Sequence, residues 1–249
     1  MEISAEQLRA MAAHVDDMHH DAMTTFREQT GELHLASSGA GRRALLTKAA
    51  IGGAAIGGAA ITAGSLLAPA RALAASSARA ALTDGEIAAF AQSVELAAVA
   101  AYGIAGGVLS ADVKPVADLF AKHHQDHADA FGALAGSKAT GKANTKLVTA
   151  LTPTLQGIKD QTAALRFAFQ LENQAAETYA FALTVLQSVD AAKGTATILP
   201  IESAHAGVLG FALGMELEAE YPTGAFITAQ VGDGTDIAKG VDPTVFPVG

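Results

Sequence analysis

Two short patterns each occur twice in this chain of 249 residues, and they constrain its fold more than any other feature. Residues 95–102 (ELAAVAAY) match residues 172–179 (ENQAAETY), with Glu first and Tyr last in both. The segment 124–127 (HQDH) matches 202–205 (ESAH) in the same way. The partners are 77 residues apart in the first pattern and 78 in the second. Residues three or seven apart lie on one face of an α-helix, so the patterns predict four helices whose carboxylates and imidazoles point to a common centre.

The composition favours a helical protein. Half of the residues are hydrophobic, 16% are charged and Ala is abundant, which suits closely packed helices better than a β-protein or a disordered chain. The chain has no Cys, so thiolate metal sites and disulfides are excluded, and a metal would need His and carboxylate ligands. The formal net charge of −9, without a basic cluster in the bundle region, argues against nucleic acid as a partner.

Local signals give the expected bounds of these helices. Thr83 and Glu86 form a capping-box pattern, Gly194 is expected to stop a turn, and Pro200 suits the first turn of a helix. We expect helices over about 84–109, 112–136, 161–189 and 200–215, with a long connection over 137–160. The prediction is an all-α four-helix bundle made of two helical hairpins joined by a long crossover.

The chain divides into four predicted segments. They are a cytoplasmic leader (1–41), a targeting segment (42–74), the bundle (75–221) and an irregular tail rich in Gly and Pro (222–249). In the leader, apolar residues recur at helical spacing and predict one short amphipathic helix: Leu8, Met11, Val15, Met18 and Ala22. The same helix carries His14, Met18, His19, His20 and Met23. These could be read as a metal patch, but a leader that is rich in His by chance, or that binds a chaperone, is the favoured interpretation, and we place no site there.

The targeting segment begins with Arg42-Arg43 and continues with an uncharged stretch over 49–70. Residues 72–74 (ALA) have the small-x-small pattern of a cleavage site. Five glycines dilute the apolar stretch, so the segment resembles twin-arginine signals more than general secretory signals. We therefore expect the twin-arginine export machinery as a partner and an extracytoplasmic location. The alternative is an uncleaved membrane anchor, since 22 residues without charge could span a bilayer.

Three of the repeated residues are carboxylates in apolar surroundings. Glu95, Glu172 and Glu202 lie among Ala, Val, Leu and Phe, and burying a carboxylate costs several kcal/mol unless it is neutralised, paired or bound to a metal. Lys and Arg are nearly missing from these faces, and Arg166 is the one candidate partner on the third helix. Metal coordination, or hydrogen bonds shared with the Tyr and His residues of the patterns, would keep the carboxylates inside.

With these residues, the chain resembles the ferritin-like superfamily and is similar to exported ferritin-like proteins of actinobacterial type. The resemblance covers the bundle almost entirely and implies a set of roles. Glu95 and Glu172 would be terminal ligands, Glu202 would bridge two metals, His127 and His205 would each bind one, and Tyr102 and Tyr179 would hydrogen-bond the carboxylates in support.

His124 is the departure from this resemblance, because it stands where the pattern has a second Glu. An imidazole cannot bridge two metals through a pair of oxygens. The alternatives left open are one tightly held metal, an asymmetric pair, or a different metal. Near the site, His123 and Asp126 are expected on a solvated helix edge, and Glu177 is expected at the surface or between helices.

Two functions follow as hypotheses. The first is an exported oxidoreductase that holds one or two Fe or Mn ions per chain, with Zn as a further option, and reacts with O₂ or peroxide. The second is a metal-poor bundle that serves as an envelope binding or stress-protection protein without catalysis. A homo-oligomer is compatible with both. The acidic residues after the fourth helix could attract cations for storage, but a solvated edge is favoured: Glu216, Glu218 and Glu220.

Overall fold

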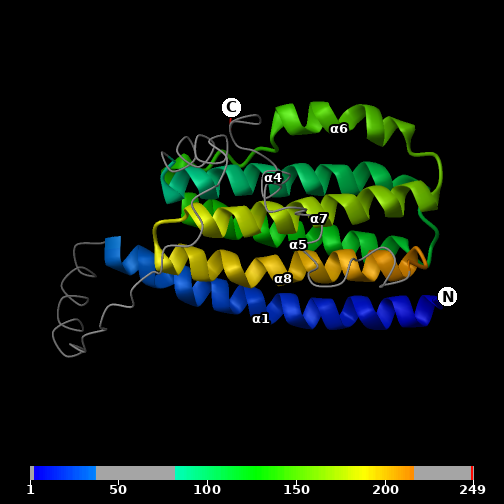
Figure 1. Ribbon diagram of the computed structural model, residues 1–249, viewed down its shortest axis with the longest axis horizontal. Coiled ribbons are helices and arrows are strands. Elements are labelled where there is room, and N and C mark those ends of the chain that lie inside the picture. Colours follow the sequence, from blue (N-terminus) through cyan, green and yellow to red (C-terminus); the bar gives the residue numbers. More distant parts are fainter. Residues whose placement is uncertain (1–2, 38–81, 216–247, 249) are drawn as a thin grey trace, which may run out of the picture.

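Four antiparallel helices form the centre of the computed structural model, which describes residues 3–37, 82–215 and 248. Helix α4 (Asp84–Ala105) pairs with α5 (Lys114–Ala135), and α7 (Gln161–Val185) pairs with α8 (Val189–Ala212) (Figure 1). The described residues are helical with short connections and contain no strand, so the all-α prediction is confirmed. The predicted targeting segment, the predicted C-terminal tail except residue 248, and the three acidic residues at 216, 218 and 220 lie outside the described residues.

Capping side chains fix where α4 begins. The hydroxyl of Thr83 accepts the backbone N–H of Glu86 at 3.3 Å, and the Glu86 carboxylate accepts the backbone N–H of Thr83 at 2.9 Å, which is the expected capping box. Asp84 accepts the backbone N–H groups of Gln187 and Ser188 at 2.8 and 2.7 Å. The start of α4 is therefore tied to the α7–α8 turn, which holds the two hairpins in register.

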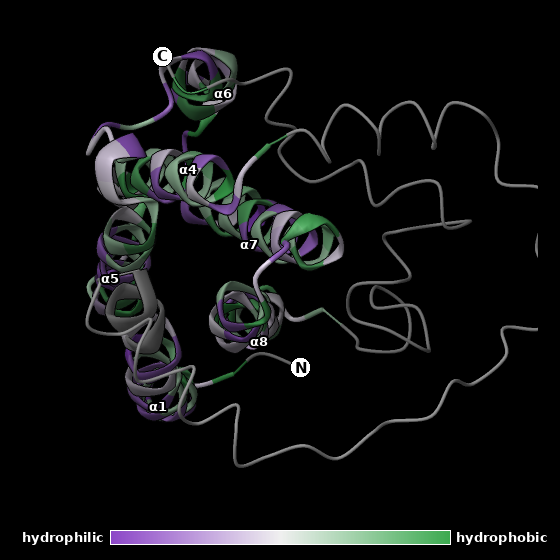
Figure 2. Cartoon of the chain, turned by 90° about the vertical axis from the view of Figure 1, so that its left-hand side faces the viewer, coloured by the Kyte–Doolittle hydropathy of each residue, from purple (hydrophilic) through white to green (hydrophobic). Residues whose placement is uncertain are grey.

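The crossover between the hairpins contains a helix that the sequence analysis missed. Within the expected connection, α6 (Thr145–Gly157) is capped by Asn144, whose side chain accepts the N–H of Leu147. The backbone N–H of Asn144 also donates to the carbonyl of Ser93 at 2.8 Å, so α6 is attached to the outside of α4 (Figure 2). The polar residues 141–145 hid the apolar periodicity that follows them.

The fourth helix begins earlier than predicted. Helix α7 ends at Val185, and α8 starts at Val189 after the cap residue Ser188, so both Gly194 and Pro200 lie inside α8. Pro200 has no N–H to donate, and a helix needs no N–H from its first turn, so the sequence predicts Pro200 at the start of the helix. Packing of α8 on its neighbours overrides this local cost, as tertiary context commonly does.

A fifth long helix lies along this bundle, and it comes from the predicted leader. Helix α1 (Ala5–Ser37) is 33 residues long rather than short, and it packs along α8 and α5 (Figures 1 and 2). Its buried side chains recur every three or four residues and form a stripe toward the bundle: Leu8, Ala12, Val15, His19, Met23, Phe26 and Thr30. The leader helix is thus part of the folded core and not a separate appendage.

Gly194 lets α1 approach α8 closely. A Cβ at this position would lie 3.2 Å from the Thr30 methyl group and 3.3 Å from the Phe26 ring. The Phe26 ring meets Phe131 of α5 edge to face, with ring centroids 5.5 Å apart, and is 1% exposed. Phe26 therefore joins α1 to both hairpins.

The segment Asp84–Val108 is long and apolar enough to cross a membrane, by length and composition only. Of its most apolar stretch, 72% is buried inside the bundle. A core helix accounts for this composition, because α4 is covered by its neighbours on most sides.

Replacing Phe26 by Ala should destabilise the full-length chain, because it removes a buried aromatic ring between α1 and the hairpins. We expect a loss of about 3 kcal/mol or more in the free energy of unfolding, measured by chemical denaturation. Arg27→Ala, at an exposed position of the same turn, is the control and should change this free energy by less than about 0.5 kcal/mol. Equal stability of the two variants would show that α1 does not dock on the bundle.

Candidate metal centre

Each of the four central helices contributes to one buried polar cluster, called here the Glu/His centre. Its members are Glu95 from α4, His124 and His127 from α5, Glu172 from α7, and Glu202 and His205 from α8. All six side chains are at most 2% exposed. Their ligand atoms fall into two overlapping groups, each within 4.8 Å, and Glu202 and His124 belong to both. The structure therefore brings together all six residues singled out in the sequence.

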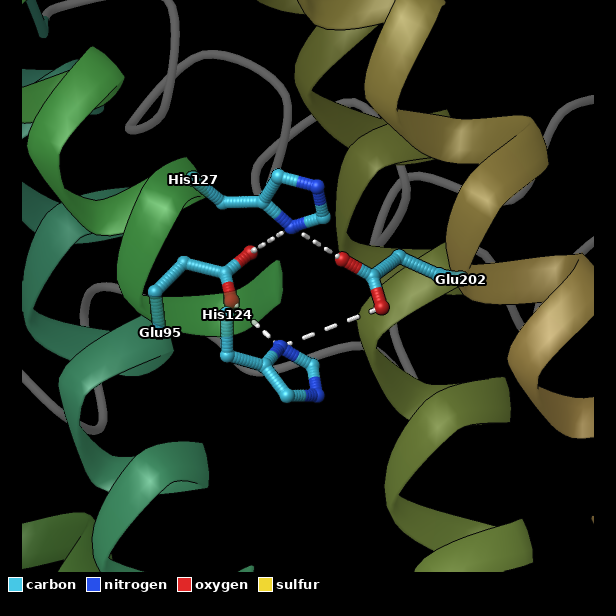
Figure 3. A group of neighbouring side chains, drawn as sticks. All are labelled: Glu95, His124, His127 and Glu202. Atoms are coloured by element: carbon cyan, nitrogen blue, oxygen red, sulfur yellow. Dashed lines mark hydrogen bonds and ion pairs between the residues drawn. The ribbon is translucent and has the colours of Figure 1, made fainter. Parts of the chain in front are cut away.

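The first group is formed by Glu95, His127 and Glu202, with His124 below them (Figure 3). The Nδ1 atom of His127 lies 2.8 Å from Oε1 of Glu202 and 3.6 Å from Oε1 of Glu95. These three atoms are buried, yet none of them has an aligned hydrogen bond. Buried polar atoms are rarely left unsatisfied, so their convergence suits a cation bound between them.

The second group is formed by Glu172, Glu202 and His205, together with His124. Nδ1 of His205 lies 3.2 Å from Oε2 of Glu172 and 3.3 Å from Oε2 of Glu202. Glu202 thus presents one carboxylate oxygen to each group, as a bridging carboxylate does. The donor set of imidazoles and carboxylates suits Fe, Mn or Zn.

His124 lies between the two groups and contacts a carboxylate through each ring nitrogen. Its Nδ1 is 2.6 Å from Oε2 of Glu95, and its Nε2 is 3.0 Å from Oε1 of Glu172. Burial lowers the pKa of His124, but the charges of Glu172, Glu202 and Glu95 outweigh this effect and raise it well above the usual value. A protonated His124 therefore donates to both carboxylates. A neutral ring has one lone pair and can serve only one metal.

Carboxylates also raise the pKa values of the other two imidazoles of the centre. Burial lowers the pKa of His127, but Glu202 and Glu95 raise it to about 9, and Glu172 and Glu202 raise the pKa of His205 against the same effect of burial. The imidazoles in turn lower the pKa of Glu172 well below its usual value, although burial acts in the opposite direction. Arg166, the expected alternative partner, is exposed. Within the described residues, the charge of the centre is thus balanced by His alone.

The two tyrosines of the repeated pattern have different surroundings. The hydroxyl of Tyr102 donates to Oε1 of Glu172, so it supports a carboxylate across the α4–α7 contact. Tyr179 stacks on Phe131 with ring centroids 5.5 Å apart, and within the described part of the chain it has no hydrogen bond to the Glu/His centre. The internal symmetry of the sequence is therefore broken in the supporting contacts as well as at position 124.

His123 was expected on a solvated edge, and this expectation is wrong. It is fully buried, with Nδ1 at 2.9 Å from Nε2 of His205 and Nε2 at 3.0 Å from Oδ1 of Asp16 in α1. His19 of α1 is also buried and stacks on the His123 ring. His123 was expected in solvent, and no site was placed at His19, because α1 covers the side of α5 that a four-helix bundle would leave open. The signal available was the position of His19 in the helical stripe of the leader.

Two acidic neighbours of the centre have different environments. Asp126 is partly exposed and pairs with Lys122 at 2.7 Å, in line with the expected helix edge. Glu177 is 5% exposed and so lies between helices and not at the surface, the second of its two expected positions. It belongs to neither group of the Glu/His centre.

This fold and centre define a class: an all-helical bundle with a buried Glu/His cluster compatible with metal binding. A family model described as ferritin-like domain matches residues 81–215, more than half of the chain. The protein therefore belongs to the ferritin-like domain family, and the expected superfamily is confirmed. Helix α1 lies outside the matched region. No curated protein and no solved structure matched the chain.

Replacing His124 by Glu should raise the metal content of the protein. We expect fewer than two ions per chain in the natural protein, because a neutral His124 can serve one half of the centre only, and a count closer to two in His124→Glu. Elemental analysis gives the count, and Mössbauer spectra of iron-loaded samples should show magnetic coupling only in the variant. Two equivalent, coupled irons in the natural protein would contradict this account of His124.

Proposed function

We propose that the protein is a metal-dependent oxidoreductase that holds Fe or Mn in the Glu/His centre and reacts with O₂ or peroxide. The observation that carries the proposal is the convergence of three buried ligand atoms, from Glu95, His127 and Glu202, within 4.8 Å of one another. The contacts between these atoms are within ion-pair range but lack the alignment of hydrogen bonds, as expected for side chains arranged around a cation. Carboxylate and imidazole ligands suit Fe(II) and Mn(II) better than softer metals.

The roles of the side chains follow from the two groups. Glu95 and His127 would form one half of the centre and Glu172 and His205 the other, with Glu202 shared, and His124 could complete only one half. When bound, the metal supplies the electron transfer to the oxidant. The chain keeps bulk water out, since the ligands are at most 2% exposed, and the Tyr102 hydroxyl holds Glu172 in place. These contacts orient the ligands before metal arrives, which is the usual role of supporting hydrogen bonds.

An apolar pocket reaches the centre from beneath α6. Glu95 and Tyr179 form part of its wall. The remaining lining includes Val94 of α4, Leu151 of α6 and Leu171 of α7. A small apolar oxidant such as O₂ partitions favourably into such a pocket, whereas ions do not. The pocket therefore supports O₂ chemistry at the Glu95 side of the centre.

A metal-poor role is the second candidate, and one observation favours it. The carboxylates of Glu95 and Glu172 are already neutralised by His124, which bonds to both. A bundle with this pairing could remain folded without metal and serve as a binding or stress-protection protein in the cell envelope. Metal analysis of protein purified without chelator distinguishes the two functions, because only the oxidoreductase requires bound ions.

The location of the protein is a proposal based on sequence alone. Arg42-Arg43 and the uncharged stretch that follows are typical of a twin-arginine signal, which would export the protein already folded. Export in the folded state would allow the centre to take up its metal in the cytoplasm. Cell fractionation with N-terminal sequencing tests this, and protein found only in the cytoplasm would rule it out.

Replacing Glu202 by Gln should remove metal and the reaction with peroxide together, because the shared side chain loses its negative charge and one of its two oxygens while its shape is kept. We expect at least a tenfold loss in affinity for Mn(II) or Fe(II) and no metal-dependent consumption of peroxide or O₂. Glu28→Gln, an exposed substitution on α1, is the matched control and should behave as the natural protein. Full metal content in Glu202→Gln would refute the proposed centre.

A further inference from the structure

A chain of short contacts connects the surface of α1 with the Glu/His centre. Oδ1 of Asp16 lies 3.0 Å from Nε2 of His123, and Nδ1 of His123 lies 2.9 Å from Nε2 of His205. The far nitrogen of His205 faces Glu172 and Glu202. The Asp16 side chain is 53% exposed, whereas both imidazoles are fully buried. The contacts therefore lead from solvent to one ligand of the centre.

Only one arrangement of protons lets His205 bind a metal and keeps both hydrogen bonds, from His205 to His123 and from His123 to Asp16. A metal at Nδ1 of His205 leaves the proton on Nε2, which then donates to Nδ1 of His123. His123 must then carry its own proton on Nε2 and donate it to Asp16. The carboxylate at the end accepts only, so it selects this tautomer of both rings.

Neighbouring rings hold the two imidazoles in the required planes. His19 stacks on His123 at 3.8 Å between ring centroids with 13° between planes, and Phe120 stacks on His205 at 4.1 Å. Burial lowers the pKa of His19 to about 2, so this ring is neutral and adds no charge. Asp16, His19 and His123 do not suit an ion of their own, because stacked rings direct their lone pairs into parallel planes and not toward one point.

We propose that Asp16 and His123 are positioning residues of the metal centre, through which helix α1 orients His205 for coordination. The inference rests on the proposed metal-binding function and adds to it a contribution from outside the matched ferritin-like region. Ligating imidazoles commonly donate their second N–H to a carboxylate, and loss of such a partner weakens metal binding. Here the carboxylate of Asp16 acts through the imidazole of His123, and Asp16 lies on α1, which precedes the matched ferritin-like region.

The test compares Asp16→Ala with Asp17→Ala in the full chain, using Zn(II) as the probe in competition with a chelator. Both residues are exposed on the same helix, but only Asp16 contacts His123. We expect Asp16→Ala to bind Zn(II) about 10- to 100-fold more weakly, and Asp17→Ala to bind as the natural protein does. The metal-free Asp16→Ala variant should melt below Asp17→Ala, because buried His123 loses the acceptor of its Nε2 proton.

Histidine ¹⁵N NMR of the zinc-loaded proteins provides a readout that a purely structural role would not change. Nε2 of His123 should carry the proton in the natural protein and in Asp17→Ala, and a mixture of tautomers should appear in Asp16→Ala. Equal affinities and equal tautomers in the two variants would overturn this inference and leave the proposed function standing. Failure of the natural protein to bind Zn(II), Mn(II) or Fe(II) would overturn both.

Discussion

The structure depends on how three carboxylates are kept inside an apolar bundle. Glu95, Glu172 and Glu202 are each at most 2% exposed, and within the described residues no Lys or Arg reaches them. Positive charge must come from protonated imidazoles or from bound metal, since an uncompensated buried carboxylate costs several kcal/mol. The same side chains can supply either kind of compensation. Protons and metal ions therefore compete for the same imidazole nitrogens, and the centre must release protons when it binds an ion.

Helix α1 covers the side of the bundle next to the Glu/His centre, a side that four helices alone would leave open to solvent. His19 covers His123, and the stripe from Leu8 to Thr30 seals the groove between α5 and α8. If the proposed signal is cleaved after residue 74, α1 is no longer covalently joined to the bundle. The contact between Asp16 and His123 would then belong to the precursor, in which metal uptake is expected. A leader docked in this way links the folding of the bundle to the completion of its metal centre.

The six residues of the centre could be predicted because their spacing needs only helical periodicity and a repeat of 77 or 78 residues. The burial of His123 could not be predicted, because the sequence does not show that the leader helix packs against this side of α5. Helix α6 and the early start of α8 were missed because polar loop residues, Gly194 and Pro200 are local signals that packing overrides. Local sequence rules thus predicted which residues share a helix face, but they did not predict helix bounds and burial that depend on contacts between distant segments.

The most direct test of the centre is the number of protons released when metal binds. The carboxylates hold the pKa of His127 near 9 and that of His124 well above its usual value, so both are protonated at neutral pH before an ion enters. Calorimetric titration of Mn(II) or Fe(II) into metal-free protein, in buffers of different ionisation enthalpy, measures this release. We predict net proton release and an affinity that increases from about pH 6 to pH 9, since the proton competes with the metal for the same lone pair. Binding without proton release, or no binding across this range, would contradict the assignment of the Glu/His centre as a metal site.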